Sequence, residues 1–214
     1  MVLPTNVPVN AVIDLSHWNT VTSFVAIKAD GIAGVVHKAT QGMTYVDPTY
    51  AQRQIKATVA GLRWGAYHFG TGDDPIAQVD HFLSTVKPDT HTLLALDLES
   101  NPNGLSMSRA NAEQFVTEVH RRLGRWPILY TGAWYVRNIM FANTITALSN
   151  CPLWIASYIP QPDIPPQWTT WKLWQYTDGQ SGPAPWGVHG VEGHCDRNKF
   201  NGTMDELLTF WDSQ

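Results

Sequence analysis

Short apolar runs alternate with amphipathic stretches along the first two thirds of the chain. The segments following the first four runs place apolar residues at helical spacing, as in 108–123, where Phe115, Val119 and Leu123 lie four residues apart. The apolar runs that predict strands are 11–18, 32–40, 63–70, 92–100 and 126–132. Five strand–helix units in succession predict right-handed crossovers and a mainly parallel sheet.

Asp-Pro pairs and glycines mark the expected helix boundaries. The pairs at 47–48 and 74–75 each predict a helix with proline at its first position. Gly61 and Gly124 follow periodic stretches and predict helix ends. Shorter helical segments are expected in 22–30 and 133–143, the second of them after the fifth strand.

The pattern changes after residue 150. Three further runs predict strands at 152–158, 171–177 and 194–200. They are separated by loops rich in Pro and Gly, and a last helix is expected over 204–211. Eight strands, five with helices and three largely without, predict an α/β fold, a modified TIM-type barrel. A doubly wound open sheet is the alternative. We expect one domain over residues 1–214, with its core at about 11–212.

Composition narrows the class of protein. Of the 214 residues, 43% are hydrophobic and 15% charged, which argues against a disordered chain. The net charge of −4 and the lack of a Lys/Arg cluster argue against a nucleic-acid partner. No apolar run approaches the roughly 20 residues that span a bilayer, so membrane insertion is not expected. Cys151 and Cys195 form no CxxC and are expected to be free structural thiols.

The fourth predicted strand ends in two acids. Side chains along a strand alternate, so Asp97 and Glu99 should share one face, with their Cα atoms about 6–7 Å apart. Two carboxylates so close repel each other, which raises one pKa and yields a proton donor beside an anion. Glycoside hydrolysis requires this pairing. A solvated strand end remains the alternative, because acids are common there.

Two more predicted strands carry acids. Asp14 follows an apolar run in the first strand, and Asp196 lies in the last. A turn or helix cap is the alternative for Asp14, and a charged strand rim for Asp196. Since the chemistry of such barrels lies at the C-terminal ends of the strands, we expect these acids to converge with Asp97 and Glu99.

Other chemistries find less support. The sequence holds no H-E-x-x-H, no H-x-H and no G-x-S-x-G motif. His37 and His68 lie near predicted strand ends, where a hydrogen-bonded core or rim role is commoner than metal binding. We therefore expect neither a metal site nor a cofactor. Eight of the ten tryptophans lie after residue 125 and serve either as core or as flat platforms for a sugar ring.

Eight segments together resemble the glycoside hydrolase family 25 lysozymes, the N-acetylmuramidases, over about residues 12–202. They are AVIDLSHWN, VVHKATQGMTYVDPTY, WGAYHF, LALDLES, PILYTG, PLWIASY, LWQYTDG and CDRNKFNG, in this order. The resemblance implies a modified barrel and hydrolysis, with retention, of the β-1,4 bond from N-acetylmuramic acid to N-acetylglucosamine in peptidoglycan. The family's four acidic positions match Asp14, Asp97, Glu99 and Asp196.

The resemblance also implies a role for each acid. Glu99 would be the general acid, and Asp97 would act on the 2-acetamido group of the muramic sugar, which attacks the anomeric carbon to give an oxazolinium-like intermediate. A direct nucleophilic role for an aspartate stays open. Asp14 and Asp196 would position the pair and raise the pKa of Glu99.

Sugar contacts are expected from rim aromatics and amides, and about half of the candidates should prove to be ordinary core. By position the candidates are Tyr67, Tyr130, Trp154, Tyr158 and Gln175. Gln41 and Asn19 stand where the family often has Glu and Gln, respectively. Neither departure touches the four acids.

The expected partner is a peptidoglycan glycan strand, and the expected state is a monomer without a separate cell-wall-binding domain. The first ten residues lack the basic start and apolar core of a secretory signal. This favours a phage endolysin made in the host cytoplasm, and a secreted enzyme whose leader has been removed is the alternative. A chitin-type hydrolase and a non-catalytic glycan-binding module are the competing functions.

Overall fold

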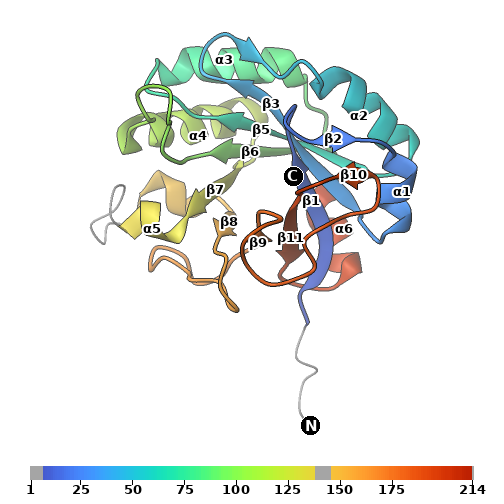
Figure 1. The fold of residues 1–214 in the computed structure, drawn as a ribbon. Helices are drawn as coiled ribbons and strands as arrows, with labels where there is room; N and C mark the ends of the chain where they lie inside the picture. The colour runs from blue at the N-terminus through green and yellow to red at the C-terminus, as the bar shows by residue number, and fades with distance from the viewer. Residues whose placement is uncertain (1–6, 138–145, 214) are drawn as a thin grey trace.

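A closed barrel with helices packed around it forms the body of the protein (Figure 1). The computed structural model describes residues 7–137 and 146–213. Over these residues, eight strands follow one another around the barrel in the order β1-β11-β9-β8-β7-β6-β5-β3, and pairing of β1 with β3 closes it. The open-sheet alternative is therefore wrong, and the modified barrel is confirmed.

The barrel strands fall within or close to the eight predicted runs. They are β1 (Val9–Leu15), β3 (Gly34–Gln41), β5 (Arg63–Phe69), β6 (Leu93–Asp97), β7 (Ile128–Gly132), β8 (Leu153–Ala156), β9 (Leu173–Thr177) and β11 (Asp196–Phe200). Three two-residue strands were not predicted: β2 (Thr20–Val21) pairs with β10 (Val191–Glu192), and β4 (Tyr45–Val46) pairs with β3. The barrel is mixed, because β11 runs antiparallel to both of its neighbours, β1 and β9.

Helices follow the strands of the first five units, as expected. They are α1 (Phe24–Ala29), α2 (Tyr50–Val59), α3 (Pro75–Val86), α4 (Arg109–Leu123) and α5 (Ala133–Tyr135). A 3₁₀ turn, η2 (Ala147–Asn150), precedes β8, and α6 (Met204–Asp212) follows β11. Of the predicted helix 133–143, the part from residue 138 onward lies outside the described residues.

The two Asp-Pro pairs behave differently. Asp74 caps α3 by accepting the Ala77 N–H at 2.8 Å, with Pro75 as the first helical residue, as predicted. The prediction for Pro48 is wrong, because α2 begins only at Tyr50. The Asp47 carboxylate instead accepts the backbone N–H groups of Thr49 and His17, which ties this turn to the end of β1.

Side-chain alternation divides the barrel strands between two layers. Along β6, Leu94 and Leu96 pack outward against the helices, while Leu93, Ala95 and Asp97 point inward. The interior at the N-terminal end of the parallel strands is apolar and includes Trp211 of α6. The Trp211 indole packs so closely on Gly34 that a Cβ atom there would collide with it. The interior at the C-terminal edge of the parallel strands is polar.

Candidate active site

A pocket of about 110 Å³ opens at this polar edge of the barrel. Seven of the eight barrel strands, all but β3, contribute a residue to its wall, and Glu99 lies two residues beyond the end of β6. The lining residues are Asp14, Tyr67, Asp97, Glu99, Tyr130, Trp154, Gln175 and Asp196. The structure thus brings together all four acids that the sequence singled out, and four of the five candidate sugar contacts.

Asp97 and Glu99 lie on the same side of the chain although β6 is shorter than predicted. The strand ends at Asp97, and the buried Leu98 donates its N–H to the Tyr130 carbonyl at 2.9 Å. This bond keeps the extended course for one more residue, so the Glu99 carboxyl also faces the pocket.

Asp14 and Asp196 meet because β11 is antiparallel. Asp196 is the first residue of β11, and it pairs in register with Asp14 near the end of β1. A hydrogen bond links the two carboxyls. The first residue of an antiparallel strand therefore reaches the same barrel edge as the last residues of the parallel strands.

A buried amide network holds the Asp14 carboxylate. Asn198 Nδ2 donates to Asp14 Oδ2 at 2.8 Å, and Gln175 Nε2 lies 3.1 and 3.2 Å from the two carboxylate oxygens. Asn198 in turn accepts from Trp154 Nε1 at 2.6 Å. Sequence reasoning missed Asn198, which lies two residues after Asp196 on the same strand and shares its face by alternation.

Gln175 also accepts hydrogen bonds from two tyrosines. Its Oε1 atom accepts from the Tyr130 hydroxyl at 2.9 Å and from the Tyr158 hydroxyl at 2.7 Å. This hydrogen bond to Gln175 holds Tyr158 beside the pocket. Tyr158 is partly exposed, whereas Gln175 and Trp154 are buried. Gln175 and Trp154 therefore support Asp14 from within the protein.

Lys38 is a second residue that sequence reasoning missed. Its Nζ atom donates to Gln41 Oε1 at 2.6 Å and lies 4.8 Å from the centre of the Phe69 ring. Its positive charge favours the ionised forms of both Asp97 and Glu99. Alternation along β3 places Lys38 on the interior face with Val36.

Burial and crowding raise the pKa of every acid in the pocket. Burial raises the pKa of Asp97 well above its ordinary value, and the Glu99 charge adds to this while Lys38 opposes it. Burial likewise raises the pKa of Glu99. The Lys38 charge lowers this pKa, and the Asp14 charge raises it further. For Asp14, burial outweighs the hydrogen bonds from Asn198 and Gln175, which lower the pKa. Burial and then the Asp14 charge raise the pKa of Asp196 to about 9. With a pKa of about 9, Asp196 retains its proton at neutral pH.

One fully buried carboxylate oxygen in the pocket lacks a hydrogen-bond partner among the described residues. Asp97 Oδ1 is buried, and no described residue forms a hydrogen bond with it. A buried carboxylate oxygen without a donor is costly, so this atom is a ready acceptor for an N–H or O–H group of a bound molecule.

The candidate metal ligands His37 and His68 belong to the core instead. His37 stacks on Trp64 and His68 on Phe115, with ring centres 5.5 and 5.1 Å apart. Burial lowers the pKa of His37 to about 4 and that of His68 to about 3. Within residues 7–137 and 146–213, no group of three or more His, Cys, Asp or Glu residues is arranged to hold a metal ion.

The remaining expectations concern cysteines and membrane spans. Cys151 and Cys195 are both buried and free, as predicted. In the described part of the chain, no helix combines the length and apolarity needed to cross a bilayer.

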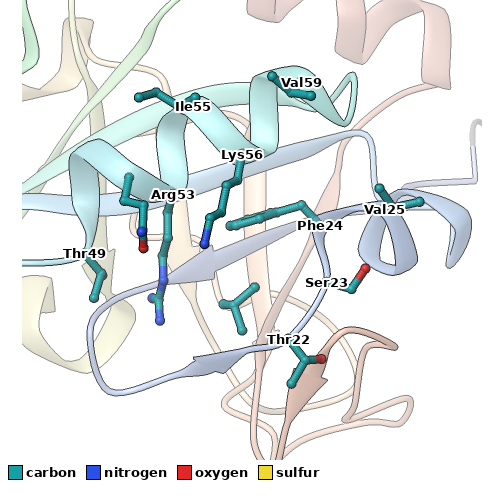
Figure 2. A pocket seen from close by; sticks show the side chains of 11 residues that line it. Thr22, Ser23, Phe24, Val25, Thr49, Arg53, Ile55, Lys56 and Val59 are labelled. Carbon is teal, nitrogen blue, oxygen red and sulfur yellow. The ribbon is translucent and has the colours of Figure 1, made fainter.

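A larger cavity of about 430 Å³ lies outside the barrel, between α1 and α2 (Figure 2). Its walls combine the exposed side chains of Val25, Ile55 and Val59 with the basic residues Arg53 and Lys56. No Asp or Glu among the described residues lines it. We call it the α1/α2 groove.

Known proteins resemble this chain along nearly its whole length. The sequence model described as "Glycosyl hydrolases family 25" matches residues 13–184. Lysozyme M1 of Streptomyces globisporus is 33% identical over 211 residues, covering 92% of this chain and 69% of that protein. The N,O-diacetylmuramidase of Chalaropsis sp is 30% identical, covering 91% of this chain and 95% of that one.

A solved structure shows the same architecture. The family GH25 lysozyme from Aspergillus fumigatus superposes with a TM-score of 0.82 and 32% identity, covering 97% of this chain and all of that one. The match of the family model extends over far more than half of the chain, and the barrel with its acidic edge agrees with it. The chain therefore belongs to glycosyl hydrolases family 25.

Proposed function

We propose that this protein is a muramidase that hydrolyses the β-1,4 bond from N-acetylmuramic acid to N-acetylglucosamine in bacterial peptidoglycan. The names of its relatives, a lysozyme and an N,O-diacetylmuramidase, support this substrate. The observation that carries the proposal is the pocket in which Asp14, Asp97, Glu99 and Asp196 meet. The site of action is accordingly the bacterial cell wall, for a phage endolysin as for a secreted enzyme.

Glu99 is the general acid in this proposal. It is half-buried, lines the pocket, and has a pKa raised by burial, which favours the protonated form that a general acid needs. The proton passes to the departing glycosidic oxygen as the bond to the anomeric carbon breaks. The resulting carboxylate later takes a proton from the attacking water.

Asp97 orients the substrate's own nucleophile. Its unpartnered Oδ1 is suited to accept the N–H of the 2-acetamido group, whose carbonyl oxygen then attacks the anomeric carbon. Accepting that hydrogen bond favours the ionised form of Asp97 and leaves the pair's proton on Glu99. The cyclic oxazolinium intermediate is then opened by water, and configuration is retained.

Asp14 and Asp196 are positioning residues. Asp14 is held by Asn198 and Gln175, and its charge adds to the raised pKa values of Glu99 and Asp196. The Asp14 charge provides the negative field around the anomeric carbon, where positive charge develops in the transition state, and the protonated Asp196 donates to Asp14.

Digestion of purified peptidoglycan tests the substrate and the bond. Released fragments are reduced and analysed by mass spectrometry, and a muramidase leaves N-acetylmuramic acid at the reducing end. Reducing-end N-acetylglucosamine would contradict the proposal. Binding without any release would identify a glycan-binding module, and preferential cleavage of chitin oligomers would identify a chitin-type hydrolase.

The stereochemistry is tested separately by proton NMR of the first product. We expect the β-anomer before mutarotation. Initial α-anomer would contradict retention, and a covalent sugar adduct on the intact enzyme would replace the acetamido route with direct attack by an aspartate.

A further inference from the structure

The turn that follows β1 exposes a tryptophan a few residues along the chain from the acid pocket. Trp18 has 84% of its surface exposed, more than any other Phe, Tyr or Trp among the described residues. It lies four positions after Asp14, a pocket residue, which limits the distance between their Cα atoms to about 14 Å. Trp18 is not one of the residues that line the acid pocket.

Hydrogen bonds fix the backbone of this turn from both sides. The Asn19 side chain accepts the Ser16 N–H at 2.8 Å and donates to the His194 carbonyl at 3.3 Å, two residues before Asp196. Arg53, which extends from α2 in Figure 2, donates to the carbonyls of Ser16 at 2.7 Å and Asn19 at 2.6 Å. The turn is therefore anchored both to the entry of β11 and to α2.

The Trp18 indole rests on a ring that is itself held in place. The ring centres of His17 and Trp18 lie 4.4 Å apart. His17 Nδ1 lies 3.0 Å from Asp47 Oδ2 and 3.1 Å from the Tyr45 hydroxyl, and the His17 N–H donates to Asp47 Oδ2 at 2.8 Å. Trp18 thus presents a supported aromatic face to solvent, at little cost in conformational entropy on binding.

The pocket is too small for a polymer. Its volume of about 110 Å³ lies below the roughly 300–1,000 Å³ of common small-molecule sites. A glycan strand must therefore continue across the rim, where an aromatic face suits the apolar C–H face of a sugar ring.

We propose that Trp18, supported by His17, forms a further glycan-binding subsite for a sugar beyond the two that flank the cleaved bond. The proposal rests on the muramidase function above and extends the site from the pocket onto the turn after β1. Trp18 contributes to binding of long strands and takes no part in bond cleavage.

The test compares wild type, Trp18→Ala, Trp18→Phe and Val59→Ala on two substrates. Val59 lies on α2 in the α1/α2 groove and has the same exposed fraction, 84%, so it controls for the loss of an exposed apolar side chain. The substrates are purified sacculi and the shortest glycan fragment that wild type cleaves. Thermal midpoints confirm that all four proteins fold.

On sacculi we expect Trp18→Ala to raise KM about tenfold with kcat unchanged, a change of about 1.4 kcal/mol in binding. Trp18→Phe should retain most of the affinity, and Val59→Ala should match wild type. On the short fragment all four proteins should be equal.

Two outcomes separate this inference from the proposed function. If wild type releases no fragments from sacculi, the muramidase function fails and the subsite fails with it. If wild type is active and Trp18→Ala has the KM of Val59→Ala, or loses kcat instead, the subsite alone is overturned.

Discussion

The acid pocket and the α1/α2 groove differ in what surrounds them more than in their size. The groove is the larger, at about 430 Å³ against about 110 Å³. Its walls are side chains on helix surfaces, several of them largely exposed, such as Val25 and Val59. The pocket's walls are the ends of barrel strands, and two of its carboxyls, Asp14 and Asp97, are only 7% exposed.

This difference shows why the volume of a cavity alone does not identify a catalytic site. A carboxyl changes its pKa when it is desolvated and placed beside other charges, and both conditions require a rigid, buried wall. The strands of the barrel provide that wall, and the amide network around Asp14 holds it. In the groove, side chains remain in contact with water, and no described carboxyl lines it. Four substitutions test this contrast, in order of decreasing effect.

Glu99→Gln should have the largest effect. The amide cannot donate the proton to the leaving group, so kcat should fall by about 10²–10⁴-fold while binding to sacculi is retained. Initial rates of reducing-sugar release measure kcat, and cosedimentation with sacculi measures binding. Ile55→Ser, on α2 in the groove, is the control and should keep the wild-type rate. Undiminished turnover in Glu99→Gln would remove its assignment as general acid.

Asp97→Asn should lower kcat by about 10²–10³-fold, because a neutral amide does not stabilise the charge that develops at the acetamido group. The same assay applies, with the amide close in size to the carboxylate so that packing is preserved. An unchanged kcat would show that the unpartnered Oδ1 of Asp97 has no part in the reaction.

Asn198→Ala should destabilise the pocket wall itself. It removes the hydrogen-bond partner of the buried Trp154 Nε1, while Asp14 Oδ2 loses one donor and keeps Gln175 Nε2. A buried group left unsatisfied costs about 1–3 kcal/mol, so urea unfolding should show a loss of that size. Ile55→Ser again serves as the comparison, with an expected change within about 0.5 kcal/mol. Equal stability of the two variants would mean that the network does not hold the wall.

Asp196→Asn should change the pH dependence of stability. With a pKa raised to about 9, the folded protein holds a proton on Asp196 that the unfolded chain releases near its ordinary value of 3.8. The contribution of Asp196 to stability is thus fully present below pH about 4 and is lost as pH rises towards about 9.

Asn cannot ionise, so the thermal midpoint of Asp196→Asn relative to wild type should rise between pH 5 and pH 9. The asparagine can still donate to Asp14, which preserves the link between β1 and β11. The difference between the two proteins reports the linked titration of Asp196 and Asp14, because His37 and His68 contribute alike to both. Parallel curves would show that Asp196 is ionised throughout in the folded protein.

Local pattern alone determined much of this protein. The period-two alternation of β6 placed Asp97 and Glu99 on one face, and the apolar runs located all eight barrel strands. The capping chemistry of Asp74 and Pro75 identified the start of α3. These features depend on backbone sterics and on burial of neighbouring residues, both of which act over a few positions in the chain.

Only the tertiary structure decided which strands pair and which distant residues come into contact. The direction of β11 follows from its pairing with β1 and β9, and a parallel β11 would have carried Asp196 to the opposite end of the barrel. Asn198 and Lys38 became part of the site, and Pro48 fell outside α2, through contacts made between distant segments. Pairing and long-range hydrogen bonds depend on which surfaces meet in space, and this is not encoded in the spacing of residues along a strand.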